Sequence, residues 1–427
     1  MLTTDSLNVR LLDYGPRPSP DRVVSASGLL TVKSGDFFEI LKGADEKFVK
    51  GFHREATRRG HASLLTTPYF WFWVRGSRLI DFYATSVPFG SFIIFSSRRI
   101  RISPEIAVMP SSFSGESVRV FERAVSEMMG AYDSLQKMGF TVDEARRVLP
   151  LGFFSQGLYS FSLQTIMGMY WERSNLPGEL RAFVERLVDL AEQKAPLTVK
   201  NAREMKFATH YPQRHPFKPP VDMPSSGTEV LLNEIDLSGY SREMSWEKWK
   251  ELSELAKTRV IVKIDTEFSL SAWNDIKRHR TALQEVEAIY SAAKRGEMYI
   301  PDRVAGKEAA REIYEDACSA GMESYELFRE EQEEAVYVLP HALKVKTRLI
   351  LNGYHLFDPF GLFGVRLCTT ADFELRERLW EAVEKLGELG RLVGPKCKLG
   401  RCPERTFCAE VLKYNREYSR QAHESKR

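Results

Sequence analysis

Residues 145–150 read ARRVLP and residues 335–340 read AVYVLP, and each Val-Leu-Pro follows acidic residues and a helical stretch that contains tyrosine. Other segments repeat at a similar spacing. Val9 in residues 8–14 (NVRLLDY) matches Val230 in residues 229–233 (EVLLN). The helical stretch after Arg181 likewise matches the one after Glu377. A repeat of roughly 190 to 220 residues is far too long for a solenoid. The pattern therefore predicts two fused domains of one ancestry.

Composition supports two domains and excludes several classes of partner. A chain of 427 residues with 43% hydrophobic content can bury two cores of about 200 residues each. Its net charge of +3 gives no bulk reason to expect nucleic acid or an anionic membrane as a partner. No apolar run approaches the roughly 20 residues that span a bilayer, and no export signal opens the chain. Five cysteines, unevenly placed, suit reduced thiols. We therefore expect a cytoplasmic protein.

A proline-rich stretch divides the chain. Residues 210–227 hold five prolines and show no apolar periodicity, as is typical of a linker. We therefore expect a first copy over 1–215, a linker over 216–227, and a second copy over 228–427 that ends in a polar tail with cysteines.

Both copies are expected to mix helices with a few non-consecutive strands. The predicted strands are 8–14, 68–74, 229–233 and 259–264. The predicted helices are 36–57, a segment from Ser77, 118–138, one that begins near Asp143, 158–173, 180–193, 246–255, 269–291, 307–334, 345–357 and 371–389. The resulting fold class is α+β, with a β-sheet wrapped by α-helices in each copy.

The sharpest chemical feature is the basic run Lys277-Arg278-His279-Arg280. Four consecutive side chains cannot share one face of a helix. Such a run therefore either fans out into solvent at a helix end or surrounds a polyanion. Taken alone, the run favours the solvated helix end.

The surroundings of this run resemble the flavin-dependent thymidylate synthases of the ThyX type. That family has R-H-R followed at fixed offsets by Ser, Asn-Glu, Ser and Arg, with G-H-x-S/T-x-x-E upstream and A-R-x-V-L-P downstream. Copy one keeps the outer pieces, namely Gly60-His61-Ala62-Ser63, the ARRVLP motif with Arg146, and Ser91, Ser96 and Arg98 at the later offsets. Ser86-Val87-Pro88 stands where the family has R-H-R. Arg173, 27 residues after Arg146, takes the place of a nucleotide-binding arginine.

Copy two is nearly the complement of copy one. It keeps Arg278-His279-Arg280, Asn352 and Arg366-Leu367-Cys368, the last resembling the family's R-L-C segment. It lacks the upstream histidine, and Val336 replaces the arginine of the A-R-x-V-L-P motif. Neither copy is complete, because Thr66, Ile94 and Val286 stand where the family has glutamate.

The resemblance implies an enzyme that methylates dUMP to dTMP with FAD, NADPH and methylenetetrahydrofolate, at a composite site between the two copies. It implies a homodimer that presents four ThyX-like units, and no metal. The implied catalytic residues are Arg278, His279 and Arg280. The implied cofactor-binding residues are these three with His61, Ser63 and Asn352, and the implied substrate-binding residues are Ser96, Arg98, Arg146, Arg173 and Arg366. The alternative is a non-catalytic relative that binds a flavin or nucleotide or serves in assembly.

Three cysteines near the end form a separate cluster, Cys397, Cys402 and Cys408. Zinc ribbons use four ligands in closely spaced pairs, and this cluster offers three. We favour a structural turn, with a metal site as the alternative.

Overall fold

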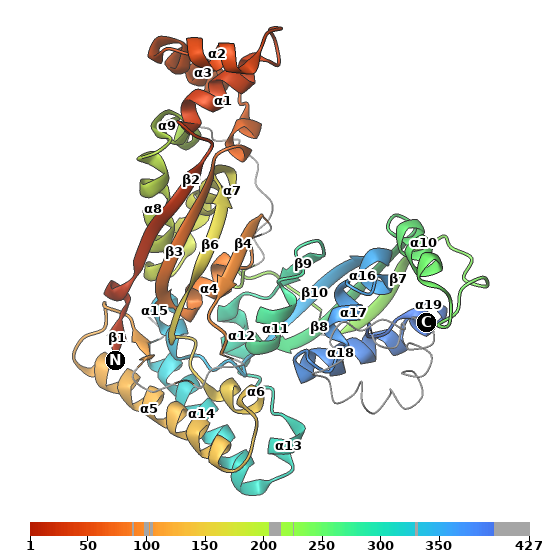
Figure 1. Cartoon of the computed structure of the whole chain (residues 1–427). Helices are drawn as coiled ribbons and strands as arrows, with labels where there is room; N and C mark the ends of the chain where they lie inside the picture. The colour runs from red at the N-terminus through yellow and green to blue at the C-terminus, as the bar shows by residue number, and fades with distance from the viewer. Residues whose placement is uncertain are drawn as a thin grey trace, which may run out of the picture. The chain divides into compact units, whose positions relative to one another are not determined.

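The computed structural model describes residues 1–87, 89–97, 102, 106–204, 215–224, 226–328 and 332–396. The chain forms two compact units (Figure 1). The first combines Met1–Pro219 with Arg303–His341, and the second combines Pro220–Asp302 with the chain from Ala342 onward. The division after Pro219 falls inside the predicted linker. Residues 303–341, which the sequence assigns to copy two, fold as part of the first unit.

A four-stranded antiparallel sheet forms the centre of the first unit, in the order β2-β3-β6-β4. Its strands are β2 (Asn8–Gly15), β3 (Tyr69–Ser77), β4 (Gly90–Ile94) and β6 (Phe154–Ser162). A short parallel pair joins β1 (Leu2–Thr3) to β5 (Val108–Met109). The helices are α1 (Pro20–Leu29), α2 (Phe37–Gly43), α3 (Glu46–Arg58), α4 (Arg78–Ala84), α5 (Glu116–Lys137), α6 (Val142–Ala145), α7 (Leu163–Glu172), α8 (Gly178–Glu192), α9 (Pro196–Glu204), α14 (Glu308–Leu327) and α15 (Gln332–Ala335).

Buried and more exposed side chains alternate along β3, and the buried ones form the core on one face of this sheet. Phe70, Phe72 and Val74 are buried, whereas Trp71 between them is 38% exposed. Successive strand residues face opposite sides of a sheet, so this pattern directs one face inward. Helices α7 and α8 cover that face (Figure 1), and Phe183 of α8 packs its ring against Tyr159 of β6.

The two Val-Leu-Pro motifs meet in the first unit. Each follows a 3-10 turn, η4 (Arg146–Val148) or η7 (Val336–Val338), and Pro150 forms an antiparallel bridge with Pro340. Leu151 N–H donates to the Leu339 carbonyl at 2.9 Å, and His341 N–H donates to the Leu149 carbonyl at 3.0 Å. Beside this junction α14 packs along α5 (Figure 1).

The second unit also contains a four-stranded antiparallel sheet, in the order β7-β8-β10-β9. Its strands are β7 (Gly227–Asn233), β8 (Val260–Ser269), β9 (Leu283–Val286) and β10 (Lys344–Asn352). Its helices are α10 (Trp246–Ala256), α11 (Leu270–Ile276), α12 (Ile289–Arg295), α16 (Gly353–Phe357), α17 (Leu362–Arg366), α18 (Phe373–Glu384) and α19 (Glu388–Leu392), while α13 (Asp302–Ala305) begins at its boundary. The predicted α+β class is confirmed.

The two sheets share one topology, with the first, second, fourth and third strands as neighbours. A detail beyond strand order also repeats. Ser77 ends β3, caps α4, and donates its backbone N–H and hydroxyl to the Glu179 carboxylate. Ser269 ends β8, caps α11, and makes the same two bonds with Glu374. The two sheets therefore share one strand order, while the duplication of one ancestral domain stays a prediction.

This correspondence corrects the match between Val9 and Val230. Val9 pairs with Val74, three residues before Ser77, whereas Val230 pairs with Val262, seven residues before Ser269. A short apolar run has no unique alignment, and the strands' hydrogen bonds fix the register instead.

Three predicted helices are partly strands. Residues 158–162 belong to β6, residues 345–352 to β10, and the predicted helix 269–291 is interrupted by β9. In β10 buried and half-buried side chains alternate strictly, and short apolar stretches do not distinguish this period from a helical one. Among the described residues, no helix is long and apolar enough to cross a membrane.

Two glycines test the packing of α14 on its neighbours. A Cβ at Gly321 in α14 would lie 2.7 Å from the Val338 carbonyl oxygen, whereas a Cβ at Gly130 in α5 would meet nothing within 4 Å. We predict that Gly321→Ala lowers the free energy of unfolding by about 1–3 kcal/mol through overpacking. Gly130→Ala should raise it by about 0.5–1 kcal/mol, because alanine is the better helix former. Urea unfolding measures both, and equal effects would contradict this packing.

Candidate functional site

In the second unit, the basic run lies directly after α11. Ser269 begins this seven-residue helix with its side-chain cap, so the turn that follows carries Arg278, His279 and Arg280. Arg278 forms an ion pair with Asp275, one helical turn earlier. The Arg278 side chain is 42% exposed, whereas that of Asp275 is 3% exposed. The buried carboxylate therefore holds an arginine whose side chain remains partly exposed.

Arg366, at the end of α17, comes to the same turn. Its Nε–H donates to His279 Nε2 at 2.8 Å, and its Nη2 donates to the Asp275 carbonyl oxygen at 2.9 Å. Burial lowers the pKa of His279 to about 3, and the charges of Arg366, His355 and Arg278 act in the same direction. A neutral histidine thus lies among arginines, a combination suited to an anionic ligand.

A second histidine supports the strand end that carries Asn352. The backbone N–H of Asn352 donates to Nδ1 of His355 at 3.1 Å, and Nε2 of His355 lies 3.0 Å from Thr281 Oγ1. Burial lowers the pKa of His355 to about 4. Gln284 of β9 adds a bond to the His279 carbonyl oxygen at 2.9 Å. The structure thus links Arg278, His279, Arg366 and Asn352 in one region.

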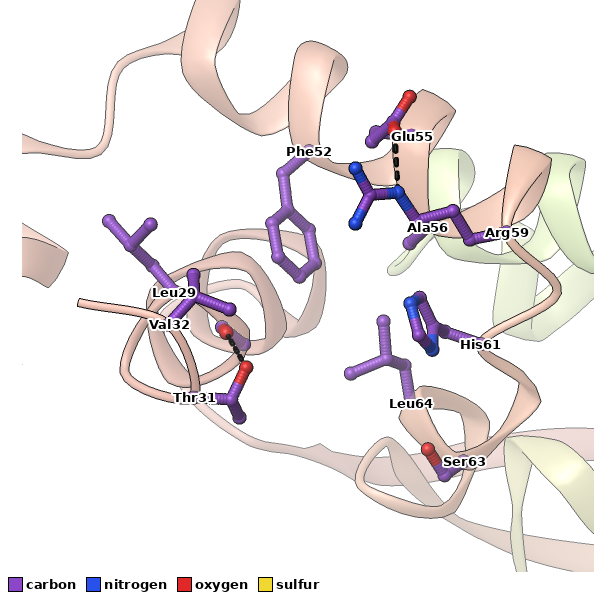
Figure 2. Close-up of a pocket in the computed structure, with 11 residues that line it drawn as sticks. Leu29, Thr31, Val32, Phe52, Glu55, Ala56, Arg59, His61, Ser63 and Leu64 are labelled. Carbon is purple, nitrogen blue, oxygen red and sulfur yellow. Dashed lines mark hydrogen bonds and ion pairs between the residues drawn. The ribbon is translucent and has the colours of Figure 1, made fainter.

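The first unit places His61 and Ser63 at a cavity of about 350 Å³ (Figure 2). Leu29, Val32, Phe52, Ala56 and Leu64 give it apolar walls, and Thr31, Glu55, Arg59, His61 and Ser63 contribute polar groups. Arg59 Nε–H donates to Glu55, and His61 follows on the turn after α3. The size and mainly apolar lining are typical of sites for small ligands.

In copy one, a buried and uncharged residue occupies the position that corresponds to Arg278 of the basic run. Ser86 lies nine residues after Ser77, as Arg278 lies nine after Ser269. The structure therefore agrees with the matched spacing. Ser86 is fully buried and donates its hydroxyl to the Tyr83 carbonyl. Nearby in α4, Asp81 accepts hydrogen bonds from Arg78, Ser155 and Tyr159, all of them buried.

The remaining predicted residues of copy one are dispersed among local partners. Arg146 is buried, and its Nε lies 2.7 Å from Asp143 Oδ1. Its Nη1 donates to Ser97 Oγ at 3.4 Å. This contact involves Ser97, the residue after the predicted Ser96. Arg173 donates to Glu185 and stacks over Tyr170. Arg98 and the cysteines Cys397, Cys402 and Cys408 lie outside the described residues.

Sequence reasoning missed Asp275, Gln284 and His355. Asp275 could have been found, because a carboxylate three residues before an arginine faces it on a helix. His355 could also have been found from its place three residues after the helix-capping position Asn352. Gln284 gives no such signal, since it reaches the turn from a separate strand.

The sequence model of a family described as thymidylate synthase complementing protein matches residues 10–197 and 257–389, about three quarters of the chain. A flavin-dependent thymidylate synthase from Pyrococcus abyssi is 34% identical over 110 residues, which cover 22% of this chain and 44% of that protein. Another, from Geobacter sulfurreducens, is 29% identical over 165 residues, 35% of this chain and 70% of that protein. The chain thus spans less than half the length of the first of these curated relatives.

Among solved structures, the fold is similar to a UMP/dUMP methylase PolB from Streptomyces cacaoi bound with 5-Br dUMP. The TM-score is 0.40 and the sequence identity 17%, over 47% of this chain and 96% of that chain.

Because His355 is buried and its pKa is lowered, we predict that the free energy of unfolding decreases in acid. The folded pKa of His355, about 4, lies below the value of about 6.5 for an unfolded histidine. The unfolded chain therefore binds more protons once the pH falls below 6.5, and stability declines down to about pH 4. At pH 5 this histidine should cost about 1–2 kcal/mol relative to pH 7.5. Urea unfolding at both pH values should show a smaller pH difference in His355→Gln, and an unchanged difference would contradict the assignment.

Proposed function

The chain belongs to the thymidylate synthase complementing protein family, and from this membership we propose that it is an FAD-dependent enzyme that methylates dUMP to dTMP. Methylenetetrahydrofolate would supply the carbon, and NADPH would supply the reducing equivalents. One observation carries the proposal: His279 is neutral and is held by Arg366 beside the partly exposed Arg278, in the copy that keeps the basic run.

The residues fit a flavin nucleotide and a nucleoside monophosphate. Phosphates require cationic donors, which Arg278 and Arg280 offer from one turn, and forked guanidinium groups suit them best. A flavin ring requires apolar walls with a few polar contacts, and the cavity beside His61 and Ser63 has both. When bound and reduced by NADPH, FAD would supply the hydride that completes the methyl group.

The chain's own part would be to bind, orient and polarise. Arg278 and Arg280 would neutralise charge on the ligands, and Asp275 would hold Arg278 in place through their ion pair. Donors fixed before the reaction favour negative charge that develops on pyrimidine oxygens. His279 is too weak a base to accept a proton near neutral pH, so its role here is to donate a hydrogen bond.

The two copies would contribute different groups to this activity. We propose that His61, Ser63, Ser96, Arg98, Arg146 and Arg173 from copy one act together with the basic run, Asn352 and Arg366 from copy two. Copy one cannot repeat the role of the basic run, because Ser86 is buried and uncharged at that position. A homodimer would then contain four such copies but fewer than four complete active sites.

We predict that Arg278→Ala lowers turnover by roughly ten- to a hundredfold, since a desolvated bond to a charged group is worth about 1.5–3 kcal/mol. Tritium release from C5-labelled dUMP, with FAD, NADPH and methylenetetrahydrofolate, measures the effect. Ser86→Ala is the matched control at the corresponding position of copy one and should retain activity. Absence of release by flavin-loaded wild type would favour the non-catalytic alternative.

The cavity of the first unit gives a separate prediction on flavin binding. Leu64→Trp should fill the space and weaken FAD binding at least tenfold, because the ring loses its apolar contacts. Leu12→Trp is the control, since Leu12 is 57% exposed and does not line the cavity. Quenching of flavin fluorescence during titration gives both dissociation constants. Equal affinities for FAD would remove this cavity from the flavin site.

A further inference from the structure

We infer that Arg366 is a positioning residue that locks His279 as the neutral Nδ1–H tautomer, so that the basic run presents a hydrogen-bond donor to its ligand. The lock itself follows from geometry. Its use, donation to a carbonyl oxygen or ring nitrogen of a planar heterocycle, rests on the proposed function.

The direction of the hydrogen bond between Arg366 and His279 permits one assignment. A guanidinium group carries five N–H donors and no acceptor, and it stays protonated in proteins. The 2.8 Å bond from Arg366 Nε therefore requires a lone pair on His279 Nε2. In a neutral imidazole the other nitrogen then carries the proton. His279 must hold its hydrogen on Nδ1.

Several groups fix the ring and its charge. Arg366 is itself held by the Asp275 carbonyl oxygen at 2.9 Å, and Gln284 holds the His279 carbonyl oxygen. The titratable groups that act on the ring are Arg366, His355 and Arg278, and each disfavours a positive imidazolium. Protonation would also remove the lone pair that accepts from Arg366. The tautomer and the neutral state therefore support each other.

The neighbouring His355 shows the opposite arrangement. Its Nδ1 accepts from the backbone N–H of Asn352, which cannot act as an acceptor. Its proton consequently lies on Nε2 and donates to Thr281 Oγ1, 3.0 Å away. The second unit thus contains two neutral histidines of opposite tautomer, each set by a donor that cannot reverse. His355 serves as an internal reference for His279.

The experiment is nitrogen-15 NMR of the full chain labelled at histidine, without ligand, with assignment by His279→Gln. We expect His279 to show a protonated Nδ1 and an unprotonated Nε2 that stay unchanged between pH 5.5 and 8. His355 should show the reverse pattern. Wild-type spectra with His279 protonated on Nε2, or on both nitrogens at pH 7, would overturn the inference without any variant.

Two variants then separate positioning from charge. Arg366→Met keeps the length of the side chain and removes its donors, so His279 should show mixed tautomers and begin to titrate above pH 5. Arg378→Met removes a comparable charge from α18, where Arg378 pairs with Glu381, and should leave His279 unchanged. An unaltered His279 spectrum in Arg366→Met would reject the positioning role.

Ligand binding distinguishes this inference from direct substrate binding by Arg366. Arg366→Met should weaken FAD or dUMP binding about tenfold, the factor carried by one hydrogen bond. If Arg366 acts only on substrate, dUMP affinity falls while the His279 tautomer stays fixed, and the positioning role is rejected. If the tautomer shifts but neither ligand binds even to wild type, the lock stands and the proposed function fails.

Discussion

The pairing of the two Val-Leu-Pro segments is the constraint on which the first unit depends. Three backbone hydrogen bonds of 2.8–3.0 Å join residues 149–152 to residues 337–341. Gly152 permits this approach, because a Cβ there would lie 2.8 Å from both the Val108 carbonyl oxygen and the Tyr337 ring. The junction draws a segment of copy two, including α14, into the compact unit built by copy one. Residues 303–341, which follow much of copy two in the sequence, thus belong to the compact unit of copy one.

A repeated serine–glutamate contact gives the two sheets the same junction between a strand and the helix that follows it. Ser77 with Glu179 and Ser269 with Glu374 fix the same junction between a strand and a helix. Two residues after the following helix ends, one copy has Ser86 and the other has Arg278. Copy one surrounds its helix with a buried network centred on Asp81. Such a network stabilises the fold but leaves no exposed cation at that position.

In copy two, Asp275 holds two of the cations, Arg278 and Arg366. Asp275 pairs with Arg278 through its carboxylate and accepts from Arg366 through its carbonyl oxygen. His279 remains neutral between the two arginines because burial and positive charge both oppose protonation. The cluster therefore carries excess positive charge around a hydrogen-bonding ring. That combination suits an anionic ligand that also forms hydrogen bonds.

The sequence by itself determined the α+β class and the repeated motif. It also determined the spacing that makes Ser86 the counterpart of Arg278, because all three depend on residue identity and order. It also identified His279 and Arg366, and His61 and Ser63, as candidate site residues. It misjudged β6 and β10, since short apolar runs fit strand and helix periods alike. Only the tertiary structure decided that residues 303–341 fold with copy one and that Arg366 reaches His279. Both depend on contacts between residues far apart in the chain, where no local pattern specifies the partner.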